Sequence, residues 1–403
     1  MNPIRNSSPQ PSGRASAGAI SNGVKVAARI EKIPEYIFSR LNKEVAAIEK
    51  DVGRKVLNLG PGSPDFPPSE IYVQKFFEFV RHPQAHLYPG YRGVQEFNDA
   101  VRAFYKRRFD VDLEDNEVLP LLGGKDGISH LPLALADAGD NVLAPNPGYP
   151  PFSEPGPLFG VSSNYYDLLP ENGFKPDLAA LGTQINDKTR YMWINFPGNP
   201  TGAVATHDEL KTYAHFAKKH GIAVVHDNAY AEITFDGYVA PSILQIPGAK
   251  EYAAEIGSFS KTFSFAGLRM GWLVGNRNII ASLQKVKSQM DSGMALPLQL
   301  LGAFALQNRD EKWHEAMLAS YRSRRDIIAE KLKGLGLTFS LPRGSLYIWA
   351  KIPDAAKDSE SFCKDLLREK QVMLTPGIAY CSNGDRYIRA SICANVDKIN
   401  EYL

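Results

Sequence analysis

The stretch SFSKTFSFAGLRMGW, residues 258–272, is the most informative part of the chain. It sets Lys261 among small hydroxyl residues and aromatic residues, and Arg269 follows eight residues later in an otherwise apolar context. Lysine and arginine are almost never buried without partners. A pocket of this kind disfavours the ammonium form of the lysine, so the free amine can form a Schiff base with an aldehyde cofactor. The alternative is an edge strand that carries a solvated lysine.

Donors for a phosphate dianion stand in the same stretch, namely Ser258, Ser260 and Arg269. A second candidate phosphate site is LLGGKDG at 121–127, which ends an expected strand and opens a helix. There the backbone N–H groups of Gly124 and Lys125 can point at a phosphate. The segment does not match the pattern G-x-x-x-x-G-K-[ST], so we do not expect a P-loop nucleotide site.

The segment HDNAY at 226–230 follows the apolar run IAVV, which places Asp227 at the carboxyl end of a strand. A carboxylate there can pair with a protonated pyridine nitrogen. Tyr230 can hydrogen-bond the phenolic oxygen of the same ring. The alternative is that Asp227 caps a following helix.

Two loops rich in turn residues carry further candidates. In NFPGNPTG at 195–202, the amide of Asn199 can donate to the phenolic oxygen of a bound ring, although the segment is also a good turn and helix start. In PNPGYP at 145–150, Tyr149 can stack on a planar cofactor or pack under a loop.

The segment RYIRAS at 386–391 alternates polar and apolar residues, as a half-buried strand does. Its Arg389 points to one face, and an arginine fork fits an α-carboxylate in two parallel hydrogen bonds. We interpret Arg386 as a solvated neighbour.

The composition is that of a soluble globular protein. The 403 residues exceed the size at which one hydrophobic core stops growing, so we expect two lobes. The chain has 46 Lys and Arg residues against 44 Asp and Glu residues, so nucleic acid is not the expected partner. Three cysteines without a C-x-x-C pair fit a reducing compartment, and we expect the cytoplasm.

Membrane and metal sites are not expected either. The longest apolar stretch, 294–306, is shorter than the ~18 residues that a membrane span requires. His82 and His86 have the spacing of a metalloprotease pair, but the glutamate is missing and Pro83 opposes a helix interior.

Short apolar strands alternate with helices along the chain, for example at 117–127, 141–150 and 222–230. This alternation indicates an α/β fold with a doubly wound, mostly parallel sheet, whose ligands bind at the carboxyl ends of the strands. Apolar spacing predicts a helix within 29–52, and VLNLG at 56–60 reads as a strand. We expect four regions: a flexible tail at 1–28, a segment at 29–70 that joins the small domain, a large domain at 71–305 and a small α+β domain at 306–403.

Taken in order, these motifs resemble those of the class I/II aminotransferases, which are pyridoxal-phosphate enzymes of fold type I, the aspartate aminotransferase fold. The matching segments are GSPD (62–65), YPGYRG (88–93), GGK (123–125), PGYP (147–150), NPTG (199–202), HDNAY (226–230), SFSK (258–261) with Arg269, and RAS (389–391). The resemblance spans about residues 30–403. It implies that the large domain binds pyridoxal 5'-phosphate.

The resemblance also implies a role for each candidate residue. Lys261 would be the Schiff-base lysine and Asp227 the pyridinium partner. Contacts to the ring would come from Tyr149, Asn199 and Tyr230. The phosphate would be held by Gly124, Lys125, Ser258, Ser260 and Arg269. The substrate carboxylate would be received by Gly62, Asn199 and Arg389. In this family the active sites lie at a homodimer interface, and Tyr88 resembles the tyrosine that reaches the neighbouring subunit's phosphate.

Within the family, segments such as ENGFKPDL and VKSQMDSG look most like the LL-diaminopimelate and alanine aminotransferase branch. The implied reaction moves an amino group from such an L-amino acid to a 2-oxo acid such as 2-oxoglutarate. A pyridoxal-phosphate-dependent C–S β-lyase on the same fold is the first alternative. A non-catalytic pyridoxal-phosphate module, such as the effector domain of a transcriptional regulator, is the second.

Overall fold

The computed structural model describes residues 26–31, 33 and 35–403. Residues 1–25 of the flexible tail predicted at 1–28 therefore lie outside the described residues. The first described elements are a short helix, α1 (Ala28–Glu31), and a longer one, α2 (Ile37–Val52). The helix expected within 29–52 is thus present as two helices, of which α2 carries most of the predicted apolar face.

An eight-stranded sheet forms the centre of the larger lobe, in the order β2-β9-β8-β7-β6-β3-β4-β5. Its strands are β2 (Val118–Leu121), β3 (Asn141–Asn146), β4 (Ser162–Leu169), β5 (Lys175–Pro176), β6 (Thr189–Asn195), β7 (Ala223–Asp227), β8 (Ala253–Ser258) and β9 (Gly271–Gly275). The five central strands from β8 to β4 are parallel, whereas β9 is antiparallel to β8, β2 is antiparallel to β9, and β5 is antiparallel to β4. The predicted mostly parallel sheet is confirmed.

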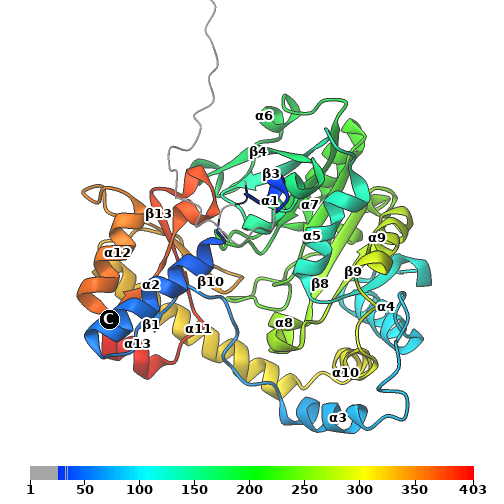
Figure 1. Cartoon of the computed structure of the whole chain (residues 1–403), viewed down its shortest axis with the longest axis horizontal. Helices are drawn as coiled ribbons and strands as arrows, with labels where there is room; N and C mark the ends of the chain where they lie inside the picture. The colour runs from blue at the N-terminus through cyan, green and yellow to red at the C-terminus, as the bar shows by residue number, and fades with distance from the viewer. Residues whose placement is uncertain (1–25, 32, 34) are drawn as a thin grey trace, which may run out of the picture.

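Both faces of this sheet are covered by helices, so its central strands are apolar on both sides. Along β6, Tyr191 and Trp193 pack into the core on one face, and Met192 and Ile194 pack into the core on the other. The first face is covered by α5 (Gly124–Leu135) and α9 (Arg277–Met290), and the second by α4 (Gln95–Phe109), α7 (His207–His220) and α10 (Leu296–Gln307). Figure 1 shows these helices around the strands.

The longest apolar stretch of the sequence became α10, a helix of 12 residues. Leu301 and Leu306 on this helix are buried in the core beside α4. Within the described part of the chain, no helix combines the length and the apolar character that a bilayer crossing would need.

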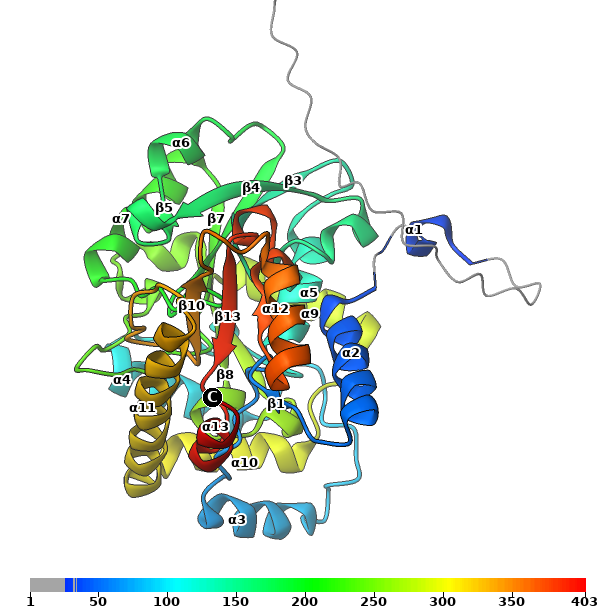
Figure 2. The same cartoon turned by 90° about the vertical axis from the view of Figure 1, so that its left-hand side faces the viewer.

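A second core lies in the smaller lobe, around a three-stranded antiparallel sheet of order β10-β13-β12. These strands are β10 (Tyr347–Lys351), β12 (Thr375–Pro376) and β13 (Tyr387–Ser391), and the helices of this lobe are α11 (Glu311–Gly334), α12 (Ser359–Lys370) and α13 (Val396–Tyr402). Figure 2 shows β10 and β13 between α11 and α12.

The segment before the large lobe contacts this smaller lobe. Strand β1 (Leu57–Asn58) pairs in parallel with β11 (Val372–Met373), and Leu41 of α2 packs against Leu367. The chain passes from there through α3 (Glu70–Val80) into the larger lobe. The domain boundaries at 70/71 and 305/306 stay predictions.

Candidate active site

A cavity of about 390 Å³ lies where the central strands of the large sheet end, against the smaller lobe. Its volume falls in the range of small-molecule sites. All but one of the residues predicted from the sequence line it, namely Gly62, Gly124, Lys125, Tyr149, Asn199, Asp227, Tyr230, Ser258, Ser260, Lys261, Arg269 and Arg389. The structure therefore brings together residues that are up to 327 positions apart in the chain, between Gly62 and Arg389.

Lys261 lies on a single helical turn, α8 (Phe259–Thr262), directly after β8. Strand β8 is paired with β7 on one side and with β9 on the other, so the alternative of an edge strand is wrong. The Lys261 Nζ donates to the carbonyl oxygen of Gly62 at 2.6 Å. Ser258 caps the turn, since its Oγ accepts from the backbone N–H of Ser260 at 3.1 Å. The capped turn positions the lysine, and the carbonyl of Gly62 holds its Nζ inside the cavity.

Asp227 is the last residue of β7 and is buried. Its carboxylate accepts from the N–H of Ala229 at 3.2 Å, and Asn195 Nδ2 donates to its backbone oxygen at 2.8 Å. No α-helix follows Asp227 within the described residues until Phe259, so the helix-cap alternative is wrong. Burial raises the pKa of Asp227 to about 6, and the hydrogen bond from Ala229 opposes that rise. A buried carboxylate in this setting suits a cationic partner.

Arg389 on β13 is buried, and no carboxylate of the described chain forms an ion pair with it. Its guanidinium donates to Asn199 Oδ1 at 2.8 Å and to the oxygen of Gly60 at 2.5 Å, while its Nε has no partner. The guanidinium carbon lies 4.0 Å from the ring centroid of Tyr347, within range of a cation–π contact. A buried cation without an acidic partner suits an anionic ligand such as a carboxylate.

The N-terminus of α5 and Arg269 together form an anion-binding corner. Gly123 precedes the helix with a φ of +83°, and a Cβ at this position would lie 2.5 Å from Arg269 Nη2. Glycine is therefore needed for the close approach of the guanidinium. Arg269 is exposed, and its Nη1 donates to the oxygen of Ala266 at 2.8 Å. Unpaired N–H groups at a helix start, beside a guanidinium, attract a phosphate.

Three aromatic residues of the cavity were not singled out in the sequence: Tyr36, Phe38 and Tyr347. The Tyr347 hydroxyl lies 2.9 Å from that of Tyr230, whose pKa is raised by burial. A Cβ on Gly62 would lie 1.8 Å from the Tyr347 hydroxyl, so this tyrosine requires glycine at 62. The apolar run in SLYIWAKI, residues 345–352, predicts a strand there, but no sequence signal shows that Tyr347 faces the site.

The first turn of α2 closes one side of the cavity. The Nζ of Lys125 lies 4.6 Å from the ring centroid of Tyr36, the residue just before the helix. Tyr149 packs edge to face on Phe152, at 5.6 Å between centroids, and its pKa is raised by burial. Tyr149 also lines the cavity, and its stacking on a cofactor ring stays a prediction.

Tyr88 is the predicted residue that does not line the cavity. It lies after α3 and is 87% exposed, in a segment with other exposed apolar side chains. Its predicted role concerns a neighbouring subunit, and that role stays a prediction.

A larger cavity, of about 860 Å³, lies elsewhere between the lobes, and none of the predicted residues lines it. Two of its basic side chains already have partners in the chain: Lys351 pairs with Asp354, and Arg386 donates to backbone oxygens including that of Pro353. Size alone favours the larger cavity as the functional site. The smaller cavity, however, holds Asp227 and Arg389, the buried charged groups for which no ion pair is found among the described residues. Among the described residues, no group of three or more His, Cys, Asp or Glu side chains is arranged to hold a metal ion.

Comparison with known proteins agrees with this geometry. Residues 54–401 match the family described as aminotransferase class I and II. The chain is 37% identical over 383 residues to the LL-diaminopimelate aminotransferase of Gloeobacter violaceus, covering 94% of this chain and 97% of the relative. The substrate-bound structure of BacF from Bacillus subtilis has a TM-score of 0.89 at 34% identity, covering 94% of this chain and 96% of that one.

The fold also matches that of an aspartate aminotransferase variant from Thermus thermophilus, with a TM-score of 0.88 at 24% identity over 94% of this chain and 98% of that one. Fold type I, expected from the motifs, is confirmed. The expectation of an aminotransferase is confirmed by the family match and by the curated relatives. The chain belongs to the class I and II aminotransferase family.

Proposed function

We propose that the chain binds pyridoxal 5'-phosphate in the 390 Å³ cavity and transfers the amino group of an L-amino acid to a 2-oxo acid such as 2-oxoglutarate. The observation that carries this proposal is the presence of Lys261, the buried Asp227 and the unpaired cation of Arg389 in one cavity. LL-diaminopimelate and alanine are the proposed amino donors. The identity of 37–39% to curated LL-diaminopimelate aminotransferases supports the first of them.

The residues of the cavity fit the cofactor group by group. The N-terminus of α5, the hydroxyls of Ser258 and Ser260, and Arg269 would hold the phosphate. Asp227 would receive the protonated ring nitrogen, and Tyr230 and Asn199 would donate to the ring oxygen. Tyr149 would lie against the ring face. When bound, pyridoxal phosphate supplies an electron sink that stabilises negative charge on the substrate Cα.

Lys261 would be the group that moves the proton of the reaction. Its amine would take the proton from the substrate Cα and would then give it to the C4′ atom of the cofactor. A positioned general base of this kind contributes on the order of 10²–10⁴-fold in rate. The carbonyl of Gly62 holds the Nζ at 2.6 Å, which keeps the amine on the side of the cavity next to Arg389 and Tyr347.

Arg389 would bind and orient the substrate through its α-carboxylate. The guanidinium is already fixed by Asn199, by the oxygen of Gly60 and by the ring of Tyr347. A preorganised donor loses little freedom on binding, so its hydrogen bonds appear in the affinity for the substrate. Arg389 and Lys261 line the same cavity and donate to the oxygens of Gly60 and Gly62, two residues apart, so a carboxylate held by Arg389 would bring Cα toward Lys261.

A substrate panel tests the proposed donors. LL-diaminopimelate, alanine, aspartate, glutamate and aromatic amino acids are each offered with 2-oxoglutarate, and glutamate or the oxo product is measured. The proposal expects turnover with LL-diaminopimelate or alanine and a strict requirement for the acceptor. Release of pyruvate and ammonia from a cysteine conjugate without an acceptor would instead indicate the C–S β-lyase, which the aminotransferase relatives do not favour. They do not favour the non-catalytic module either.

We also propose that the chain is a homodimer. Exposed apolar side chains gather on α3 and the residues after it, and contiguous patches of this kind mark interaction surfaces. They are Phe77, Val80, Leu87, Tyr88 and Tyr91. Sedimentation of the wild type should give a mass near twice that of the chain. Tyr88→Phe should remain a dimer and bind the cofactor more weakly; a monomeric wild type would overturn the proposal.

A cytoplasmic location is proposed as well. All three cysteines, Cys363, Cys381 and Cys393, are free thiols in the structure, which fits a reducing compartment.

A further inference from the structure

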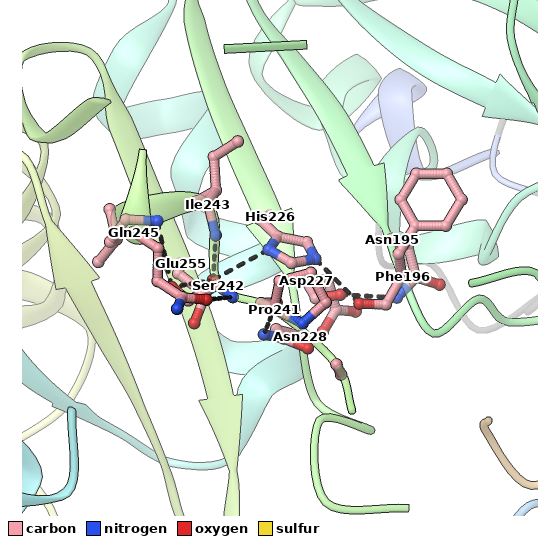
Figure 3. A network of polar contacts seen from close by, with 12 residues as sticks. Asn195, Phe196, His226, Asp227, Asn228, Pro241, Ser242, Ile243, Gln245 and Glu255 are labelled. Atoms are coloured by element: carbon pink, nitrogen blue, oxygen red, sulfur yellow. Dashed lines mark hydrogen bonds and ion pairs between the residues drawn. The ribbon is translucent and has the colours of Figure 1, made fainter. Parts of the chain in front are cut away.

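A buried polar network lies directly behind Asp227 and takes no part in the chemistry proposed above (Figure 3). His226 and Asp227 are adjacent residues of β7, so their side chains point to opposite faces of the sheet. His226 stands opposite Glu255 of β8 in the parallel register, with Nδ1 2.9 Å from Glu255 Oε2. The relative exposures of these two residues are 0% and 1%.

The hydrogen bonds around Glu255 identify it as an ionised carboxylate. The backbone N–H of Ile243 donates to Oε2 at 3.1 Å. The Ser242 hydroxyl accepts from the N–H of Leu244, so its own proton is directed to Oε2 at 2.8 Å. The Tyr105 hydroxyl lies 2.7 Å from Oε1 and accepts from an indole N–H, so its proton is also directed to the carboxylate. Three donors around one carboxyl group favour its charged form.

The contacts of His226 then fix its two protons. Its Nε2 lies 2.9 Å from the carbonyl oxygen of Phe196, which can only accept, so Nε2 carries a proton. Its Nδ1 faces the Glu255 carboxylate, whose other neighbours all donate to it, so Nδ1 donates as well. A histidine that donates from both nitrogens is an imidazolium cation.

Two features connect this cation to the proposed active site. The Phe196 carbonyl begins the loop that leads to Asn199, and the loop is held again by Asn195, whose Oδ1 accepts from the N–H of Asn199 at 2.7 Å. Asn195 Nδ2 also donates to the backbone oxygen of Asp227. His226 therefore anchors the segment that carries Asn199 and lies next to the strand end that carries Asp227.

We propose that His226 and Glu255 form a buried imidazolium–carboxylate pair that positions Asn199 and keeps Asp227 ionised as the partner of the cofactor ring nitrogen. Both are positioning residues, since neither lines the cavity. The inference rests on the proposed function, because it gives Asp227 the role described there.

The charges around Asp227 support the direction of this effect. Burial raises the pKa of Asp227, and the positive charges of His226 and Lys261 lower it. The negative charge of Glu255 raises this pKa by less than the charge of His226 lowers it. Loss of the His226 charge should therefore raise the pKa of Asp227 further. A more basic Asp227 competes more strongly with the ring nitrogen for the proton that the two groups share.

The first test concerns the charge of His226 and needs no cofactor. Nitrogen NMR of protein labelled at histidine, assigned with His226→Gln, should show both His226 nitrogens protonated at about pH 7. In Glu255→Gln one of them should lose its proton. A singly protonated His226 in the wild type would overturn the inference.

The second test concerns the cofactor. Pyridoxal phosphate labelled with ¹⁵N at the ring reports whether the ring nitrogen is protonated, and equilibrium dialysis reports its affinity. His226→Gln keeps a donor for the Phe196 oxygen but removes the charge, so Asp227 should take a larger share of the proton and the ring-nitrogen signal should shift toward the unprotonated form. Glu255→Gln should shift the signal in the same direction by a smaller amount. In this variant the pair loses the negative charge of Glu255, and His226 loses its positive charge as well.

The matched control is Tyr166→Phe. The Tyr166 hydroxyl is buried and donates to the backbone oxygen of Trp193 on β6, so this variant loses one hydrogen bond in the same sheet without touching the pair. It should lose stability and leave the ring-nitrogen signal unchanged. If His226→Gln and Glu255→Gln give the same signal as Tyr166→Phe, the inference is wrong. If the wild type itself binds no pyridoxal phosphate, the proposed function is wrong.

Discussion

Replacing Arg389 by lysine separates carboxylate binding from the rest of the mechanism. Lysine keeps a positive charge in the buried position beside Tyr347, but it cannot offer two parallel N–H groups while it also satisfies Asn199 and the Gly60 oxygen. A hydrogen bond to a charged group contributes about 1.5–3 kcal/mol. Loss of one or two such bonds to the substrate carboxylate amounts to roughly 3 kcal/mol, which is about a hundredfold in kcat/KM.

The assay compares two substrates in each enzyme. The rate of amino transfer is measured for the amino acid and for the corresponding primary amine, which lacks the α-carboxylate, and cofactor content is checked by absorbance. We expect Arg389→Lys to lose about a hundredfold with the amino acid and less than threefold with the amine. Equal losses on both substrates, or no loss on the amino acid, would refute the role of Arg389 in carboxylate binding.

Three further changes have directions that the structure sets. Cofactor-free Asp227→Asn should be more stable to urea than the cofactor-free wild type at about pH 7, by up to about 3 kcal/mol, because the folded-state pKa of about 6 lies above the unfolded one. This difference should be complete above pH 6 and vanish as the pH falls toward about 4; a constant difference would contradict it. Gly123→Ala places a Cβ 2.5 Å from Arg269 Nη2 at a φ of +83°, so dialysis should show pyridoxal phosphate binding at least about tenfold weaker than in the wild type. Gly62→Ala displaces Tyr347 and should raise KM for the amino acid, as initial rates will show; an unchanged KM would mean that this contact is not used.

The fold could be predicted because local pattern and global architecture agree. The run IAVV, with His226 and Asp227 after it, became the interior strand β7, and the GGK segment opened α5 as expected. Since ligands of parallel sheets bind at the carboxyl ends of the strands, the candidate residues of separate motifs were expected in one place. All of them except Tyr88 line one cavity.

The rest of the site depends on contacts between distant parts of the chain. Tyr347 meets Gly62 across 285 residues, and α2 closes the cavity by packing on the smaller lobe. The motif HDNAY showed a histidine beside Asp227, but its partner Glu255 follows only from the register of β7 on β8. Periodicity predicts which face of an element is buried and not which element it meets, so these contacts needed the structure.

The proposed function depends most directly on a covalent bond between the cofactor and one lysine. Protein loaded with pyridoxal phosphate is reduced with borohydride and digested, and the labelled peptide is identified by mass spectrometry. We expect a pyridoxyl group on the Nζ of Lys261, and Lys261→Ala should take up no label while circular dichroism shows that it keeps its fold. Absence of the label from the wild type, or its presence on another lysine, would contradict the account.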